Sequence, residues 1–203
     1  GHGSSPGELA APVSAMSSGP IKALQVIHAL GMGGAETWLM EVLRLWRSRG
    51  FDAPQIDFLA TSGERGQFDD EAQELGARIH YLPYRRKDLR SFIKNFRQLL
   101  DVEGYDAIHD HQDYTSGWHF LMAGGHLPVV RVAHVHNPRS HITVNYSVSP
   151  TRKMTAAVGQ FLVGRLATHV CGTSAAILRE YGYEPGRVRR PSVSVAHCGI
   201  DVE

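Results

Sequence analysis

Short apolar runs alternate along the chain with segments whose large apolar residues recur at helical spacing. The run from Ile21 to Leu30 is typical of a buried strand, and an amphipathic helix ending at Gly50 is predicted after the glycines that follow it. The same pattern predicts further strands at residues 55–60, 78–83, 105–112, 128–138, 169–174 and near 193–198. It predicts further helices at residues 68–75, 88–104, 114–124 and roughly 150–167, and a short helix through Tyr181.

This alternation, without internal repeats, predicts an α/β fold: a Rossmann-like, doubly wound, mostly parallel sheet with helices on both faces. Residues 21–203 form this domain, whereas residues 1–20, rich in Gly, Ser, Pro and Ala, are interpreted as a flexible leader with a tag remnant. Ligands of such sheets bind beyond the carboxyl ends of the strands, which we call the carboxyl edge. Five segments are expected to meet there: residues 31–36, 84–88, 109–113, 134–140 and 172–174.

Composition and charge narrow the classes of partner. The chain has 21 Lys plus Arg against 20 Asp plus Glu. Its formal charge of +1 does not indicate electrostatic binding to nucleic acid or to an anionic bilayer. No segment reaches the run of about 18 apolar residues that spans a membrane, so at most peripheral membrane contact is expected. Cys171 and Cys198 have neither zinc-ligand nor CxxC spacing, and two thiols cannot form a disulfide framework. A reducing compartment is therefore expected, which means the cytoplasm, including the inner face of the membrane.

A glycine-rich loop follows the first predicted strand and precedes the first predicted helix. Such a helix start is an anion site, because its N–H groups lack helical partners and the helix dipole favours negative charge. The spacing Gly31-x-Gly33-Gly34-x-Glu36 departs from the dinucleotide fingerprint, whose third glycine would fall at Glu36, and there is no Walker lysine. A glycine turn without a ligand is the alternative, with Glu36 as a first-turn residue matched to the dipole.

Two His-x-His pairs end successive predicted strands. Because side chains alternate along a strand, His109 shares a face with His111, and His134 shares one with His136. Four imidazoles at one edge could bind zinc, but the pairs lack a familiar metalloenzyme spacing, so no metal is expected. The first histidine of each pair is expected to be the more buried one, and the second to reach the loop as a proton shuttle or hydrogen-bond donor.

Other reactive groups are assigned mainly structural roles. Asp110 and Asp113 are expected either to orient an imidazole or to cap the helix that starts at Tyr114, and capping is the favoured role for Asp113. Cys171 lies inside an apolar strand, where a buried, inert thiol is expected. The basic cluster Arg85–Lys87 is expected to be a solvated turn, with an acceptor-anion site as the alternative.

Six pieces of the sequence resemble, in order and spacing, the N-terminal half of a family 4 (group 1) glycosyltransferase, an enzyme of the GT-B fold. They are VIHALGMGGAETWLMEVLR, FDDEAQELGARIHYLP, YDAIHDHQDYTSGW, RVAHVHNP, HVCGTSAAILREYG and VAHCGID, which together span nearly all of residues 21–203. RVAHVHNP and GMGGAE are similar to the branch that builds bacterial capsular and exopolysaccharides.

The resemblance implies a role for each matching residue. The backbone N–H groups of the glycine loop would approach the diphosphate of a nucleotide-sugar donor, and His136 would be the catalytic residue beside the donor sugar. The implied donor-binding residues are Gly33, Gly34, Glu36, His111 and Asn137. The acceptor, a sugar or a lipid-linked sugar, would lie over residues 84–88 and the loop after Pro138.

The resemblance also implies a partner domain. Glycosyltransferases of this family are retaining and metal-independent, use the nucleotide sugar as a substrate rather than a cofactor, and hold it with a C-terminal domain that carries two glutamates eight positions apart. No such pair occurs here, and the closing CGID resembles the family's hinge sequence NGID, with Cys198 in place of Asn. The chain is therefore expected to be the acceptor-side domain, inactive without its C-terminal domain.

Three alternatives stay open. GT-B relatives with similar first halves include sugar epimerases. A module that binds a phosphorylated ligand without chemistry would also need the glycine loop. A metal-dependent hydrolase would use the four histidines of the two pairs.

Overall fold

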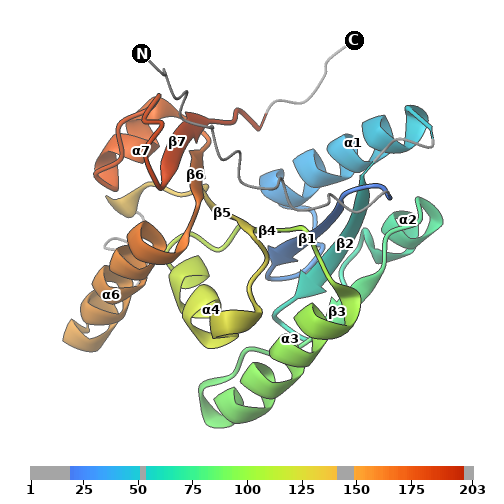
Figure 1. The fold of residues 1–203 in the computed structure, drawn as a ribbon, viewed down its shortest axis with the longest axis horizontal. Helices are drawn as coiled ribbons and strands as arrows, with labels where there is room; N and C mark the ends of the chain where they lie inside the picture. The colour runs from blue at the N-terminus through green and yellow to red at the C-terminus, as the bar shows by residue number, and fades with distance from the viewer. Residues whose placement is uncertain (1–18, 51–53, 141–148, 199–203) are drawn as a thin grey trace, which may run out of the picture.

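The computed structural model describes residues 19–50, 54–140 and 149–198. Its centre is a seven-stranded sheet of order β3-β2-β1-β4-β5-β6-β7 in which all neighbouring strands are parallel (Figure 1). The strands are β1 (Lys22–Ile27), β2 (Gln55–Ala60), β3 (Ile79–Tyr81), β4 (Ala107–Asp110), β5 (Val130–Val135), β6 (His169–Gly172) and β7 (Ser192–Val195). The predicted doubly wound parallel sheet is confirmed.

Helices cover both faces of the sheet. They are α1 (Gly34–Ser48), α2 (Asp69–Glu74), α3 (Leu89–Glu103), α4 (Thr115–Ala123), α6 (Pro150–Leu166) and α7 (Ala175–Glu180), with the 3-10 turns η1 (Arg86–Asp88) and η2 (Gly124–His126). Figure 1 shows α1 and α2 across the strands from α4 and α6. Among the described residues, no helix is both long and apolar enough to cross a membrane.

Each face of the sheet has its own hydrophobic core. The core under α1 and α2 includes Leu39, Met40 and Phe58, whereas the larger core under α3, α4, α6 and α7 includes Phe96 and Phe120. Phe58, Phe96 and Phe120 are completely buried, and burying a side chain of this size stabilises the fold by roughly 1.5–3 kcal/mol. These cores explain why the apolar periodicity located the elements, although the strands are shorter than the apolar runs that predict them.

Two glycines bring α4 and α6 into close contact. A Cβ atom on Gly117 would clash with the backbone oxygen of Gly159, and a Cβ on Gly159 would clash with that of Tyr114. The two helix backbones therefore pack without intervening side chains. This contact fixes α6 beside the carboxyl end of β4.

The order of the strands places the candidate site. The chain moves outward from β1 to β3 and then returns through α3 to β4, which pairs with the other side of β1. The loops after β1 and β4 therefore diverge and leave a crevice at the carboxyl edge. The five predicted segments all follow carboxyl ends of strands in this sheet, as expected. The predicted leader lies largely outside the described residues, as do residues 141–148 of the loop after Pro138.

Candidate functional site

The glycine loop opens the first turn of α1 to solvent. Gly33 is the N-cap residue, no side chain caps the helix, and both Gly33 and Gly34 are exposed. A Cβ on Gly34 would meet nothing within 4 Å, whereas a Cβ on Gly33 would clash with the carboxylate of Glu36. Glu36 thus lies in the first turn, as predicted from the dipole, and folds back against the helix start. Its assignment as a donor ligand stays a prediction.

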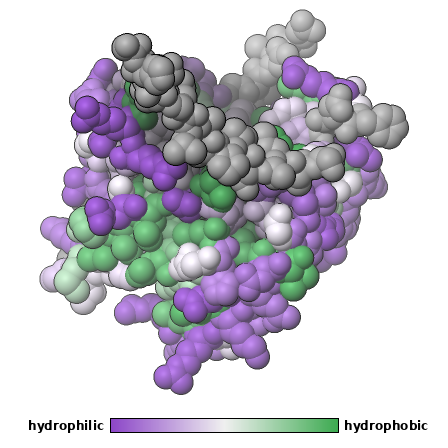
Figure 2. All heavy atoms as spheres, viewed as in Figure 1, coloured by the Kyte–Doolittle hydropathy of each residue, from purple (hydrophilic) through white to green (hydrophobic). Residues whose placement is uncertain are grey.

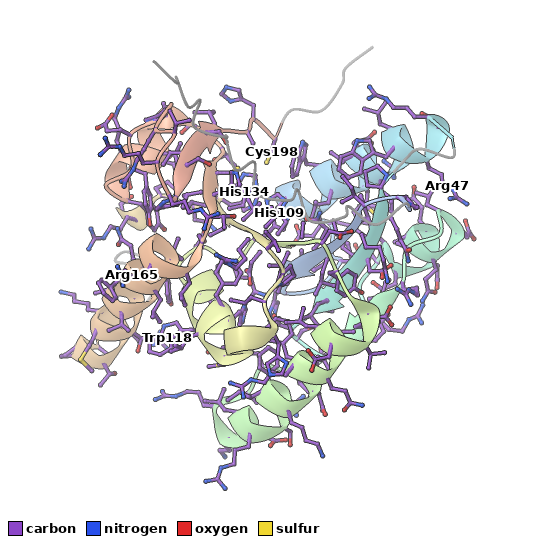
Figure 3. All side chains as sticks on the ribbon, in the orientation of Figure 1. Arg47, His109, Trp118, His134, Arg165 and Cys198 are labelled. Carbon is purple, nitrogen blue, oxygen red and sulfur yellow. The ribbon has the colours of Figure 1, made fainter. Side chains whose placement is uncertain are left out.

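The four histidines form one cluster across β4 and β5. The rings of His109 and His111 lie 4.0 Å apart between centroids, and those of His134 and His136 lie 4.1 Å apart, which confirms that each pair shares a face. Across the strands, His109 Nε2 lies 3.1 Å from His134 Nδ1, and His111 Nδ1 lies 2.9 Å from His136 Nε2. Figure 3 shows His109 and His134 close together, with Cys198 nearby.

The burial of these histidines agrees with the prediction from the sequence only on β5. His134 is completely buried and His136 is partly exposed, as predicted. On β4 the prediction is wrong, because His111 is 8% exposed while His109 is partly exposed. The chain beyond β4 continues beneath α1, where the ring of Trp38 packs edge-on against His111, with centroids 6.3 Å apart.

The cluster favours neutral imidazoles. Burial, followed by the proximity of His136, lowers the pKa of His109 to about 4, although Asp110 opposes the shift. Burial and the neighbouring rings of His136 and His109 lower the pKa of His134 to about 2, against a small opposing effect of the Ala196 backbone. Burial also lowers the pKa of His111 and, against the opposing charge of Asp113, that of His136. At neutral pH these rings are therefore uncharged.

A buried glutamine sets the tautomers of two rings. Gln25 lies in β1, is 5% exposed, and its Oε1 accepts a hydrogen bond from His111 Nε2 at 2.8 Å. His111 Nδ1 then has no proton and accepts from His136 Nε2, since a neutral imidazole carries one N–H. His136 Nδ1 is left with a free lone pair, so this atom accepts rather than donates a hydrogen bond.

Asp113 holds the loop after β5 instead of capping α4, so the capping prediction is wrong. Its Oδ1 accepts from the backbone N–H of His136 at 2.7 Å and of Asn137 at 3.3 Å, while Oδ2 accepts from Asn137 Nδ2 at 2.9 Å. The N-cap of α4 is Tyr114, without a side-chain cap. The φ of 49° at Asp113 turns its side chain toward β5, which local sequence patterns do not reveal.

Trp38 joins the glycine loop to the histidines. It lies one turn into α1, and its ring also packs edge-on against His134, with centroids 5.7 Å apart. The start of α1 and the neutral imidazoles therefore lie side by side at the carboxyl edge. Cys198, after β7, lies beside them, with Sγ 3.9 Å from His136 Nδ1.

The other predicted groups lie outside this histidine cluster. Asp110 does orient an imidazole, but that of His119, whose Nδ1 lies 2.6 Å from Asp110 Oδ2 in the core. Cys171 is partly exposed, and burial raises the pKa of its thiol against a weaker opposing hydrogen bond with Ser194, as suits an unreactive group. Residues 85–87 are exposed at η1, as expected of a solvated turn.

Two cavities flank the first half of α6. One has a volume of about 540 Å³ and is lined by Tyr84, Arg86, Leu89, Tyr114, Thr115, Trp118, Met122, Arg152 and Thr155. The other has a volume of about 360 Å³ and is lined by Tyr114, Arg139, Lys153, Ala156, Ala157, Gln160 and Tyr181. Among these described lining residues four are basic and none is acidic, and Tyr181 also donates a hydrogen bond to the backbone oxygen of Asn137 at 3.1 Å.

Three residues of the site were missed in the sequence. Gln25 carries a signal, because it is the one amide inside an apolar strand. Trp38 reads as an ordinary core residue of an amphipathic helix. Cys198 carries no signal, because its contact with His136 depends on the position of β7 in the sheet.

Comparisons with known proteins agree with this architecture. Putative glycosyltransferase EpsF of Bacillus subtilis (strain 168) is 28% identical over 190 residues, which are 93% of this chain and 47% of the relative. Capsular polysaccharide biosynthesis glycosyltransferase CapH of Staphylococcus aureus is 35% identical over 97 residues, which are 48% of this chain and 25% of the relative. The chain thus spans less than half the length of the curated relatives it matches.

Solved structures share the fold. The Anabaena protein Alr3699/HepE in complex with UDP superposes with a TM-score of 0.59 at 18% identity, over 90% of this chain and 44% of that one. MurG of Acinetobacter baumannii gives a TM-score of 0.52 at 14% identity, over 90% of this chain and 47% of that one. The family model described as Glycosyltransferase Family 4 matches residues 32–203. Because this match covers most of the chain, the protein belongs to Glycosyltransferase Family 4.

Proposed function

We propose that this domain is the acceptor-side half of a glycosyltransferase that moves a sugar from a nucleotide-diphosphate donor to an acceptor in surface polysaccharide biosynthesis. The observation that carries the proposal is the contact of Trp38, one turn into α1, with His111 and His134 of the histidine cluster. This contact places a helix start that suits an anion beside neutral polar groups that suit a sugar. The names of EpsF and CapH support this assignment.

The diphosphate of the donor binds at the start of α1. Gly33 and Gly34 are exposed at the start of the helix, where N–H groups lack helical partners, and the absence of side chains allows phosphate oxygens to approach the backbone. Glu36 competes for this position, because its carboxylate lies against Gly33. Binding of a diphosphate therefore requires the Glu36 side chain to swing outward. The related fold of HepE, which is described in complex with UDP and with UDP and glucose, supports a nucleotide-sugar donor.

His136 positions the donor sugar. Its ring is neutral, and its Nδ1 carries a lone pair because Nε2 donates to His111. A sugar hydroxyl can donate a hydrogen bond to this atom, which fixes the sugar as the diphosphate leaves. Asp113 holds the backbone of His136 and Asn137 in place for this contact.

The acceptor occupies the two cavities beside α6. Their tyrosines and tryptophan suit a sugar or an apolar chain, and their basic residues favour an acceptor that carries negative charge. Figure 2 shows hydrophobic side chains gathered over α4 and α6, where the exposed apolar residues include Leu121, Met154, Val158 and Phe161. This surface supports peripheral contact with the membrane that would carry a lipid-linked acceptor.

The donor site is completed by a C-terminal domain. This chain spans less than half of the relatives it matches. The isolated domain is therefore expected to bind donor weakly and to turn over none.

The first test is a titration of this chain with a panel of nucleotide-diphosphate sugars, followed by amide chemical shifts. We expect weakly saturating shifts at Gly33, Gly34, Glu36 and His136. Gly33→Ala and Gly34→Ala should weaken binding, whereas Gly31→Ala is the matched control, because no atom lies within 4 Å of its added Cβ. A loop that shows no shifts at millimolar ligand is a structural turn and overturns the donor assignment.

The second test uses the longer gene product. His136→Gln should lower kcat for sugar transfer about a hundredfold, the range of one lost catalytic hydrogen bond, and Cys171→Ser should leave it unchanged. Donor epimerised without an acceptor would identify an epimerase instead. Phosphate binding without any turnover would identify a binding module, and activity abolished by a chelator would identify a metal-dependent hydrolase.

A further inference from the structure

Charge is distributed unevenly along this chain, although its formal total is only +1. Residues 149–198, which include α6, α7 and β7, contain seven Lys and Arg but two Asp and Glu. All other residues together contain 14 Lys and Arg against 18 Asp and Glu. Such an asymmetry between parts of one chain is typical of proteins that bind an anionic surface. The formal charge of the whole chain therefore hides a basic region.

The exposed side of α6 is apolar along most of its length. Met154, Val158 and Phe161 follow one another at spacings of four and three, so they form one stripe on the helix, which Arg165 extends. Met154 is 65% exposed and Phe161 is 66% exposed. The opposite side of the helix packs against α4 through Gly159. The stripe therefore faces away from the core, and Figure 1 shows α6 at the outside of the fold.

Basic side chains border this stripe. The α6 sequence PTRKMTAAVGQFLVGRL contains three basic residues and no acidic one. Arg165, which Figure 3 shows on α6, lines a cavity of about 500 Å³ together with Phe161, Gly164 and Tyr183. Burial raises the pKa of Tyr183 to about 12 against the opposing charge of Arg187. Arg187 therefore lies near the end of the apolar stripe.

A second contact joins the exposed turn 186–190, before β7, to the same end of α6. Arg131 Nε donates to the backbone oxygen of Leu166, the last residue of α6, at 2.6 Å. Burial and the proximity of Arg190 lower the pKa of Arg131, so two guanidinium groups lie close together. Like charges held close together create a positive potential that an anionic surface stabilises.

An anionic lipid bilayer fits this region better than a second copy or a nucleic acid. A second copy would bring like charges together, and a nucleic acid would leave Met154 and Phe161 in water. At a bilayer, exposed apolar side chains enter the boundary between headgroups and acyl chains, while Lys and Arg bind anionic headgroups. Of the two acidic residues in this part of the chain, Glu184 already lies 3.8 Å from Arg179.

We propose that a docking face, made of Met154, Val158, Phe161, Arg165, Arg187 and Arg190, binds the surface of an anionic lipid bilayer. The two cavities proposed for the acceptor flank the first half of the same helix. Docking therefore brings these cavities close to a bilayer that carries a lipid-linked acceptor. This consequence rests on the proposed function, whereas the docking itself does not.

The test is sedimentation of this chain with vesicles of phosphatidylcholine, with and without about one third of phosphatidylglycerol. We expect binding to the mixed vesicles, binding at least about tenfold weaker to phosphatidylcholine alone, and release by about 0.5 M salt. Phe161→Ser should weaken binding roughly tenfold, the scale of one apolar side chain that becomes buried. The double variant Arg187→Gln/Arg190→Gln should weaken it roughly twentyfold, because each basic residue at an anionic surface contributes about fivefold.

Two variants on α3 are the matched controls. Val102→Ser removes an apolar side chain that is 73% exposed, and Arg90→Gln removes an exposed guanidinium. Both should bind vesicles like the unaltered chain, and urea unfolding checks that every variant is folded. No binding to the mixed vesicles at low salt, or equal losses in Phe161→Ser and Val102→Ser, would overturn the proposal.

Three other outcomes would assign the docking face to another partner and overturn the bilayer. Self-association that Phe161→Ser abolishes, without vesicle binding, would identify a second copy. A DNA fragment that binds more tightly than the mixed vesicles and tolerates Phe161→Ser would identify a nucleic-acid site. Vesicle binding by this chain but not by the longer gene product would show that the C-terminal domain covers the face. None of these measurements needs a nucleotide sugar, so failure here leaves the proposed transfer reaction standing.

Discussion

The two edges of this sheet hold polar groups in opposite ways. At the amino edge, buried Asp57 accepts from the Arg78 guanidinium at 2.6 Å and from the Tyr105 hydroxyl at 2.8 Å, and Glu103 binds the same guanidinium at 2.6 Å. At the carboxyl edge, the imidazoles bind mainly one another, and His134 Nε2 has no partner among the described residues. The first edge is a closed charge network, and the second is open to a ligand.

The difference is also visible in the proton equilibria. Burial acts to raise the pKa of Asp57, but the hydrogen bonds from Arg78 and Tyr105 outweigh it and the pKa is lowered. Burial of the histidines lowers their pKa, and the opposing effects of Asp110 on His109 and of the Ala196 backbone on His134 are too weak to offset it. Charge is thus stabilised at the amino edge and excluded at the carboxyl edge. Buried imidazoles with a lowered pKa are typical of functional sites, so a ligand is expected at the carboxyl edge.

The largest expected effect comes from opening the closed network. Asp57→Ala removes the buried carboxylate that accepts from the backbone N–H and guanidinium of Arg78 and from the Tyr105 hydroxyl. Glu103 still binds the guanidinium, so we expect the free energy of unfolding to fall by about 3 kcal/mol, the scale of several lost hydrogen bonds to a charged group. Urea unfolding measures this loss. The matched control is Asp70→Ala, because its ion pair with Arg65 is solvent-exposed and should contribute about 0.5 kcal/mol or less. Equal losses in both variants would show that the network stabilises no more than a surface pair.

As the pH falls, the two edges should lose their contributions to stability over different pH ranges. The pKa of His109 is about 4 when folded against 6.5 as a free side chain, so the unfolded state gains protons first as pH falls. Its contribution is present above pH 6.5 and is lost toward pH 4, by about 3 kcal/mol for this residue alone. The lowered pKa of Asp57 makes its contribution disappear only below about pH 4, where unfolded aspartate is protonated.

Metal-free protein unfolded in urea at a series of pH values tests this order. His109→Gln should reduce the loss of stability between pH 6.5 and 4. A stability profile that stays flat to pH 4 in the unaltered chain would show that the cluster tolerates charge.

Sequence patterns located the edges but not the contacts across them. Apolar periodicity identified every strand, and period-two geometry placed each histidine pair on one face, because both depend on neighbours in sequence. The contact of His136 with Cys198 depends on the order of β5, β6 and β7, which no local pattern encodes. Asp113 was predicted to cap α4 but binds the loop after β5, and its positive φ is a backbone feature that the local sequence does not reveal.

A smaller effect is expected from replacing Gln25, which accepts the hydrogen bond of His111 Nε2. Gln25→Leu removes the acceptor of the His111 Nε2 proton, and a buried donor left unpaired costs about 1–3 kcal/mol. Nitrogen chemical shifts of the imidazoles should also show a mixture of tautomers at His111 and His136. Gln112→Leu is the control, because this partly exposed amide bonds Thr61 instead. Unchanged imidazole shifts in Gln25→Leu would show that the rings set their own tautomers.

The smallest expected effect on stability is at Asp113, where two contributions to the free energy of unfolding oppose each other. Asp113→Gly loses the carboxylate that accepts from the backbone of His136 and Asn137, but it relieves a φ of 49° that glycine adopts freely. Each term is about 1 kcal/mol, so the net change should stay within about 0.5 kcal/mol. Asp113→Ala loses the carboxylate and keeps the strained φ, so it should be clearly less stable than Asp113→Gly. Amide exchange at His136 and Asn137 should be faster in both variants, because the carboxylate that holds this loop is gone. Exchange that stays slow would show that β5, rather than Asp113, fixes His136 at the open edge.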